Sequence, residues 1–181
     1  EARRAYERAI SLSPGLASAR TRLARILADQ GHDDLAAAQW QVAAASDSLG
    51  PEARSVAQAQ ALLLNGRPAE AAMVYDGLAQ RFADEPAHRW ARIDALLRAG
   101  GASLPAAERA LAAEKRRDSP LDVARFALLE ARLRRAQARL EDASVAYQRA
   151  AEASARARQP MLLGDARSNL GQIHRARGEH D

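Results

Sequence analysis

The sequence predicts an all-α fold, a solenoid in which antiparallel helix pairs follow one another along the chain. A three-residue pattern recurs, with alanine, a large residue four positions later, and a small or apolar residue three after that. Successive copies are offset by 34, 35, 36 and 36 residues, a period typical of helical repeats. The seven prolines lie at predicted helix boundaries, where the missing backbone N–H is tolerated. Alanine, leucine and arginine dominate the composition and favour helix.

The recurring pattern marks the second helix of each repeat, because its spacing places all three residues on one helical stripe. Its copies are Ala2, Tyr6 and Ala9; Ala36, Trp40 and Ala43; Ala71, Tyr75 and Leu78; the weaker Ala107, Leu111 and Glu114; and Ala143, Tyr147 and Ala150. These copies predict helices over residues 1–12, 34–47, 68–82, 104–116 and 139–157.

A second pattern of apolar residues followed by a turn glycine marks the first helix of each pair. It runs through Leu23, Ala24, Leu27 and Gly31; Ala59, Leu62 and Gly66; Ile93, Leu97 and Gly101; Leu129, Leu133 and Ala138; and Leu170, Gly171, His174 and Gly178. In the fourth copy, Ala138 replaces the turn glycine. The pattern predicts helices over residues 16–30, 51–64, 86–99, 121–136 and about 161–177.

The helices assemble into one predicted domain, since each pair buries its faces only against its neighbours. We expect full repeats at about 16–49, 51–85, 86–119 and 121–158, between half-repeats 1–14 and 161–181. A chain that begins and ends on half-repeats is expected to be a fragment of a longer protein.

These patterns resemble the tetratricopeptide repeat (TPR) family. The family's second-helix signature is matched by Ala2, Tyr6, Ala9 and Pro14, and its first-helix signature by Trp90, Ile93 and Leu97 and by Leu170, Gly171 and His174. The chain departs from the family's close-packing glycine, which is replaced by Ala24, Ala59, Asp94 and Glu130. The resemblance implies a right-handed superhelix with a concave face. The helix order is also loosely similar to C-terminal TPR regions of bacterial regulators with a winged-helix or Ser/Thr-kinase domain.

In this family, outward residues of the first helices line the concave groove. The resemblance carries that role onto a polar, mildly basic set: Arg25, Asp29, Gln60, His88, Arg98, Arg134, Arg135, Gln172 and Arg175. Arginines of this kind suit acidic side chains or a C-terminal carboxylate. The alternative is a solvated helix face without a ligand. The carboxylate clamp of the chaperone-binding members is not supported, because Arg92 alone matches it.

The chain offers no pattern typical of a catalytic or metal site. It contains no cysteine, and the four histidines, His32, His88, His174 and His180, lack the spacing of a zinc pair. His174 is expected to pack rather than bind, because it lies where the repeat usually has tyrosine. No phosphate loop or nucleophile motif is present either. We therefore expect no enzymatic activity, no cofactor and no metal.

Charge and hydropathy limit the partners. The net charge of +4 is spread among interspersed acids and bases, with few aromatic residues, so we expect no nucleic-acid binding through this segment. No run of about 18 apolar residues occurs, so we expect no membrane insertion. Apolar surface at the repeat ends leaves self-association open.

The expected function is therefore a non-catalytic scaffold that binds a protein or peptide, an acidic one in particular, in its groove. It would serve as the docking or sensing segment of a larger bacterial regulator. Two alternatives are a periplasmic TPR scaffold of exopolysaccharide synthesis or export, and the regulatory TPR region of an enzyme. A cytoplasmic location is favoured, with the periplasm as the alternative.

Overall fold

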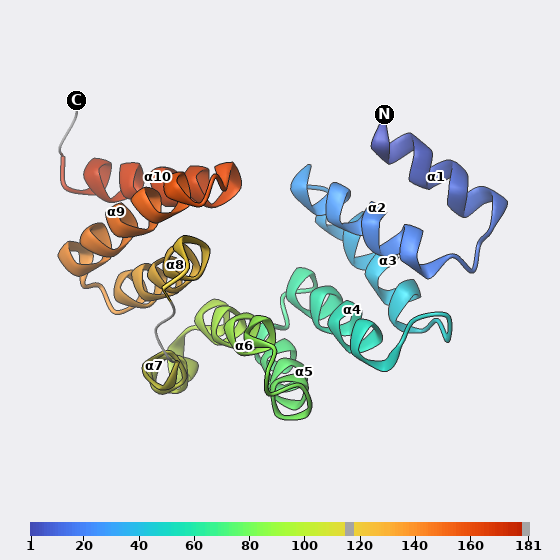
Figure 1. The fold of residues 1–181 in the computed structure, drawn as a ribbon, viewed down its shortest axis with the longest axis horizontal. Coiled ribbons are helices and arrows are strands. Elements are labelled where there is room, and N and C mark those ends of the chain that lie inside the picture. The colour runs from blue at the N-terminus through green and yellow to red at the C-terminus, as the bar shows by residue number, and fades with distance from the viewer. Residues whose placement is uncertain (115–117, 179–181) are drawn as a thin grey trace. The chain divides into compact units, whose positions relative to one another are not determined.

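The chain folds entirely into helices and connecting turns over the residues that the computed structural model describes, 1–114 and 118–178 (Figure 1). The helices are α1 (Ala2–Leu12), α2 (Ala17–Asp29), α3 (Asp33–Ala44), α4 (Pro51–Leu64), α5 (Pro68–Arg81), α6 (Pro86–Ala99), the 3-10 turn η1 (Gly101–Ser103), α7 (Leu104–Ala113), α8 (Pro120–Ala136), α9 (Leu140–Arg156) and α10 (Pro160–Ala176). The all-α prediction is confirmed. Within these ranges, no helix combines the length and apolarity needed to cross a membrane.

Proline begins many of the helices, as the sequence predicts. It is the first residue of five of them, as the bounds show, and Pro105 is the second residue of α7. At these positions the backbone N–H has no intrahelical partner, so proline's fixed φ favours the helix without losing a bond.

Two predicted helices end earlier than expected. α7 stops at Ala113, because Glu114 adopts an extended conformation with φ −70° and ψ 128°. The predicted end at 116 lies outside the described residues. α3 stops at Ala44 rather than at residue 47, and the Ser46 hydroxyl accepts a hydrogen bond from the backbone N–H of Ser48 at 3.3 Å. Serine side chains compete with helix in this way, so they favour turns.

The helices form two compact units, Glu1–Ala99 and Gly100–Asp181. In the first unit each helix from α1 to α6 packs against the next one. In the second unit α7 packs on α8, α8 on α9 and α9 on α10, while α8 also touches α10. The predicted pair 86–99 with 104–116 has one helix in each unit, so that pairing and the continuous solenoid remain predictions.

The same alanine positions are buried in successive repeats. On the first helices the fully buried set is Ala24, Ala59, Ala95 and Ala131; on the second helices it is Ala36, Ala71, Ala107 and Ala143. Such small residues let helix backbones approach closely. The prediction that Asp94 and Glu130 replace the close-packing glycine is therefore wrong, because the buried small residue lies one position later in both repeats.

Large side chains fill the space beside these alanines. Trp40, Tyr75, Leu111 and Tyr147 occupy equivalent positions four residues after the second-helix alanine, and all are buried. Both tryptophans, Trp40 and Trp90, are buried. Tyr6 shares this position but is only half-buried, and His174 is half-buried beside the buried Ile173.

Four inter-helix turns share one left-handed geometry. Gly31, Gly66, Ala138 and Arg158 have φ of 76°, 70°, 59° and 53°. The residue after each donates a 2.9 Å backbone hydrogen bond to the carbonyl oxygen five positions earlier. This is the Schellman arrangement, which glycine adopts without a steric penalty. Ala138 thus occupies the turn-glycine position, as predicted, while the sequence did not indicate Arg158.

Candidate functional site

The predicted groove residues of the first unit are mostly engaged by their own chain. Gln60 Nε2 donates to the Tyr75 hydroxyl at 2.7 Å. The Arg98 guanidinium pairs with Asp94 one helical turn earlier, at 2.8 Å. These contacts occupy the polar atoms that a ligand would use.

His88 does not lie on an open face. Only 8% of its side chain is exposed, its Nε2 lies 2.8 Å from Glu52 Oε1, and its ring lies 5.8 Å from that of Phe82. A buried imidazole held by a carboxylate and an aromatic ring has little surface left for a groove ligand. Sequence reasoning missed this contact because Glu52 lies 36 residues before His88.

Arg25 and Asp29 are exposed on α2. The Arg25 guanidinium carbon lies 6.0 Å from the centroid of the Trp40 ring, at the outer limit of a cation–π contact. The structure therefore holds Arg25 against the core aromatic of its own repeat.

The two adjacent arginines of α8 serve different surfaces, although the sequence predicts both in one groove. Arg134 Nη1 donates to Glu108 Oε1 at 3.2 Å and to Gln137 Oε1 at 3.1 Å. Arg135 instead reaches α10, where its Nη1 donates to Asn169 Oδ1 at 2.6 Å and to Gln172 Oε1 at 3.4 Å. Adjacent residues on a helix point about 100° apart, so they meet different neighbours.

Helices α8 and α10 together carry a polar surface that we call the α8–α10 face. Its members are Arg132, Arg135, Asp165, Asn169 and Gln172. Arg132 pairs with Asp165, and Asn169 Nδ2 donates to Asp165 Oδ1 at 2.7 Å. The contact of Arg135 with Asn169 lies about one turn farther along both helices, so the two rows of polar groups run side by side.

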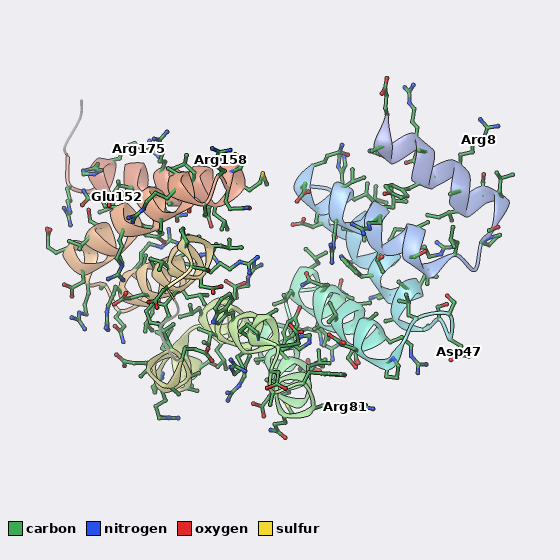
Figure 2. The ribbon with its side chains drawn as sticks, viewed as in Figure 1. Arg8, Asp47, Arg81, Glu152, Arg158 and Arg175 are labelled. Atoms are coloured by element: carbon green, nitrogen blue, oxygen red, sulfur yellow. The ribbon has the colours of Figure 1, made fainter. Side chains whose placement is uncertain are left out.

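Arg175 lies outside this face. It is exposed and projects outward from α10 (Figure 2). Its Nη1 lies 3.8 Å from where a Cβ on Gly171 would be, so the guanidinium lies along its own helix. Of the predicted set, the structure thus brings together Arg135 and Gln172.

Charge on the α8–α10 face is unevenly compensated. The Arg132 charge is balanced by Asp165. Arg135 donates only to neutral amide oxygens and pairs with no carboxylate among the described residues. The face therefore presents one guanidinium group, that of Arg135, whose charge is free to attract an anion.

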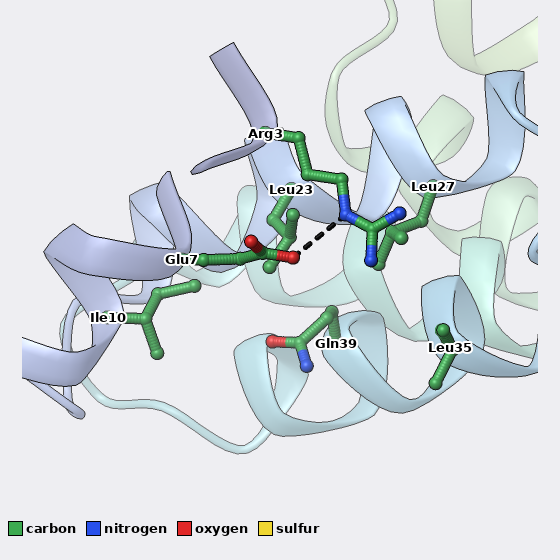
Figure 3. Close-up of a pocket in the computed structure, with 7 residues that line it drawn as sticks. All are labelled: Arg3, Glu7, Ile10, Leu23, Leu27, Leu35 and Gln39. Atoms are coloured by element: carbon green, nitrogen blue, oxygen red, sulfur yellow. Dashed lines mark hydrogen bonds and ion pairs between the residues drawn. The ribbon is translucent and has the colours of Figure 1, made fainter. Parts of the chain in front are cut away.

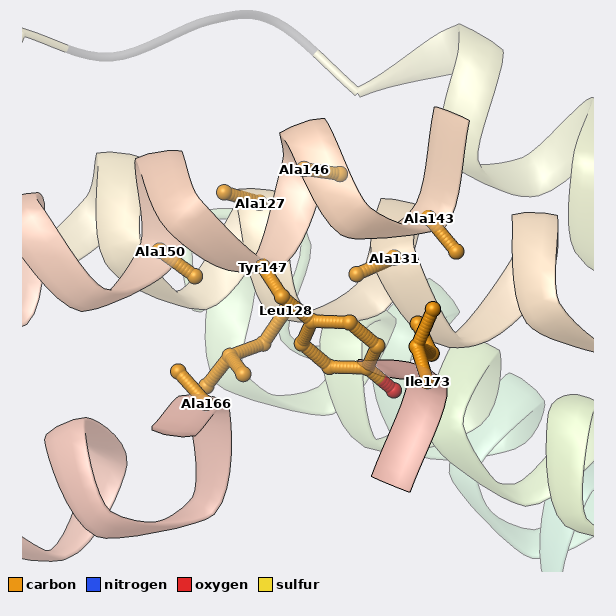
Figure 4. Close-up of a cluster of buried hydrophobic side chains, with 9 residues drawn as sticks. All are labelled: Ala127, Leu128, Ala131, Ala143, Ala146, Tyr147, Ala150, Ala166 and Ile173. Carbon is orange, nitrogen blue, oxygen red and sulfur yellow. The ribbon is translucent and has the colours of Figure 1, made fainter. Parts of the chain in front are cut away.

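Tyr147 lies in the hydrophobic cluster between α8, α9 and α10 (Figure 4). Its hydroxyl is buried and has no hydrogen-bond partner within the described part of the chain. Burial raises the pKa of Tyr147, an effect that the charges of Arg135 and Arg132 oppose. In the first unit, the hydroxyl of the equivalent Tyr75 accepts a hydrogen bond from Gln60, which lies fifteen residues earlier. In the second unit, the residue fifteen positions before Tyr147 is Arg132, which pairs with Asp165 instead.

Sequence reasoning missed Arg132 and Asn169. Arg132 stands at the same spacing from Tyr147 as Gln60 does from Tyr75, and this spacing could have placed it beside the aromatic core residue. Asn169 lies four residues after Asp165, a helical spacing at which an amide and a carboxylate meet.

A shallow depression of about 350 Å³ lies between α1, α2 and α3 in the first unit (Figure 3). Four apolar side chains line most of it: Ile10, Leu23, Leu27 and Leu35. The Arg3–Glu7 ion pair and the amide of Gln39 complete the lining.

The second unit has a depression of about 250 Å³ at the equivalent place, with opposite chemistry. Where the first repeat has Leu23 and Leu27, the fourth has Glu130 and Arg134. Arg134 pairs with Glu108, and two more ion pairs cross the depression, Arg149–Glu130 and Arg139–Asp142. Each arginine here already has a carboxylate, so the depression needs no bound anion.

No cluster of three or more potential metal ligands occurs within residues 1–114 and 118–178. His180 lies outside the described residues. No family model, curated protein or solved structure matches the chain. The likeness to TPR proteins therefore rests on the residue pattern alone, while the α8–α10 face rests on the contacts of its own side chains.

Proposed function

We propose that the chain is a non-catalytic protein-interaction module whose α8–α10 face binds an acidic segment of a partner protein. One observation carries the proposal: Arg135 is held on this face by neutral amide oxygens and has no carboxylate partner in the described part of the chain. A carboxylate at Arg135 would gain charge-assisted hydrogen bonds, which are about twice as strong as neutral ones.

The amides of the face prepare Arg135 for this role. Asn169 and Gln172 fix its guanidinium through their oxygens, so less side-chain entropy is lost when a ligand binds. Asn169 is fixed in turn by Asp165, whose carboxylate also holds Arg132. Asp165 disfavours an anion directly above it, so the preferred site lies at Arg135, about one helical turn away.

A planar guanidinium recognises a carboxylate through two parallel N–H···O bonds, so Arg135 suits an acidic side chain of the partner segment. The resemblance to TPR regions of bacterial regulators supports placing this module within a larger regulator, as its docking segment.

The test is fluorescence polarisation with a labelled decaglutamate peptide at low and moderate salt. Replacing Arg135 with Ala should weaken binding by at least about tenfold, given about 1.5–3 kcal/mol per charged hydrogen bond. The matched control replaces Arg8, which is exposed on α1, and should leave most of the affinity intact. Equal losses in both variants would reduce the effect to net charge and refute the site.

A single-stranded decathymidylate probe separates a protein ligand from a general polyanion. The proposal expects weaker binding of this DNA, because the face carries no aromatic side chain on which bases could stack. Stronger binding of the DNA, lost in the Arg135→Ala variant, would overturn the assignment of an acidic protein partner.

A further inference from the structure

The outer face of α3 is unlike the surface of the other second helices. After Asp34 the helix has no ionisable side chain, and its solvent side presents Leu35, Ala38, Val42 and Ala45, the last of which directly follows the helix end. Leu35 is 53% exposed and Val42 is 49% exposed. A surface helix normally turns charged and polar residues outward, so this stripe is an unpartnered apolar face.

Equivalent faces of later repeats show the contrast. The outer side of α5 carries Glu70 and Gln80, and that of α9 carries Asp142, Arg149 and Glu152. Since the repeat architecture itself does not require an apolar outer face, the stripe on α3 is a property of this helix. It also adjoins the depression between α1 and α3, because Leu35 belongs to both (Figure 3).

The spacing of the stripe makes it complementary to itself. Leu35 and Val42 are seven residues apart, and so are Ala38 and Ala45, which is the period of residues along a helix–helix seam. In an antiparallel pair with a two-fold axis at the level of Trp40, Leu35 would face Ala45 of a second copy. Val42 would face Ala38. Each large side chain then meets a small one, the arrangement that lets two helix surfaces interlock.

The polar edges of α3 fit the same arrangement. Gln39 and Gln41 flank the stripe near the axis, where Gln39 of one copy would meet Gln41 of the other. An amide both donates and accepts, so this meeting creates no charge conflict. Asp34 lies six residues from the axis, so its two copies would be about 18 Å apart, beyond the screening length at physiological salt.

From this fit we propose that the outer face of α3 is a homodimer interface, in which two copies of the chain pack α3 against α3 in antiparallel fashion. A single helix pair buries less than a standard interface, so the dimer is weak and concentration-dependent. The adjoining depression between α1 and α3 adds apolar surface at the edge of the contact.

Sedimentation velocity across a concentration series tests the proposal. The wild-type chain should pass from monomer at micromolar to dimer at near-millimolar concentration. Val42→Glu should weaken association by at least about tenfold, because it buries an unpaired charge against Ala38. The matched control is Met73→Glu on α5, an equally drastic change at a residue that is 75% exposed, and it should have no effect. Circular dichroism checks that each variant keeps its helices.

Mixing variants tests the antiparallel register. Val42→Glu and Ala38→Lys chains should each be monomeric alone but form a mixed dimer together, since the introduced carboxylate would face the introduced ammonium group and the other pair stays apolar. Mixing Val42→Glu with Ala45→Lys should not restore the dimer.

Three outcomes would overturn the proposal. A wild-type chain that stays monomeric at the highest concentration would do so and would leave the face to a different protein. A dimer that Val42→Glu leaves intact would also overturn the proposal. A mixed dimer formed by the Val42→Glu and Ala45→Lys chains would do the same. None of these outcomes bears on the acidic-segment site, because that test uses a different face and a peptide probe.

Discussion

Removing one hydroxyl should have opposite effects at two equivalent tyrosines. Both Tyr75 and Tyr147 are almost completely buried in the same position of their repeats. The Tyr75 hydroxyl is bonded by Gln60 at 2.7 Å, whereas the Tyr147 hydroxyl has no partner in the described part of the chain. Phenylalanine keeps the ring and its packing in both cases, so the change isolates the polar atom.

The magnitudes follow from what each hydroxyl does in the folded state. A buried polar group without a partner costs about 1–3 kcal/mol, so Tyr147→Phe should raise the free energy of unfolding by about 1 kcal/mol. A satisfied hydrogen bond contributes about 0.5–1.5 kcal/mol, so Tyr75→Phe should lower that free energy by a similar amount. Tyr6→Phe is the control, because Tyr6 is half-buried and its hydroxyl makes no bond with a described group.

Urea unfolding followed by circular dichroism and tryptophan fluorescence measures these changes. Trp40 and Trp90 both lie in the unit Glu1–Ala99, so fluorescence follows the unit that contains Tyr75, while circular dichroism follows both units. Destabilisation by Tyr147→Phe as large as that by Tyr75→Phe would refute the reasoning. It would mean that the Tyr147 hydroxyl has a partner in solution.

Two further predictions concern a turn and the response to alkali. Ala138→Gly should raise the free energy of unfolding by about 0.5–1 kcal/mol, because φ of 59° costs alanine more than glycine, although the unfolded glycine chain offsets part of the gain. Ala136→Gly, at the last residue of α8, is the control and should lower that free energy. Burial raises the pKa of both Tyr75 and Tyr147. These phenols therefore stay protonated in the folded chain at a pH of about 10, where tyrosines of the unfolded chain ionise. The stability that the two phenols contribute is therefore complete below that pH and is lost as pH rises through their folded pKa values. Chemical denaturation at pH 8 to 11 measures this loss, and each unit of difference between folded and unfolded pKa corresponds to about 1.4 kcal/mol. A double Tyr75→Phe, Tyr147→Phe variant that loses stability just as steeply would contradict this.

The helices could be predicted from the sequence because their determinants are local. Prolines at helix starts and a period near 35 residues do not depend on distant contacts. The register of the small residues was harder to see. The sequence pattern puts Asp94 and Glu130 at the close-packing position, because Ala95 and Ala131, one residue later, are buried only through their contacts with neighbouring helices.

The candidate site depends on contacts that no local pattern carries. Arg134 and Arg135 are neighbours in sequence, yet one pairs with Glu108 on α7 and the other with Asn169 on α10. His88 suits a groove by its place in the repeat, but the fold sets it 2.8 Å from Glu52. Which side of a helix meets which neighbour is a tertiary property, so polar residues on a repeat could be placed on a helix but not assigned to a surface.

The change from Leu23 and Leu27 to Glu130 and Arg134 at equivalent repeat positions has a consequence for assembly. Repeats that share one backbone plan can pair with the wrong neighbour while they fold. Helix α1, whose Ile10 packs on Leu23 and Leu27, would leave the half-buried Arg134 without Glu108 if it docked on α8, and this loss disfavours the wrong pairing. The side chains at each helix–helix contact thus favour the native pairing over pairing with the equivalent helix of another repeat.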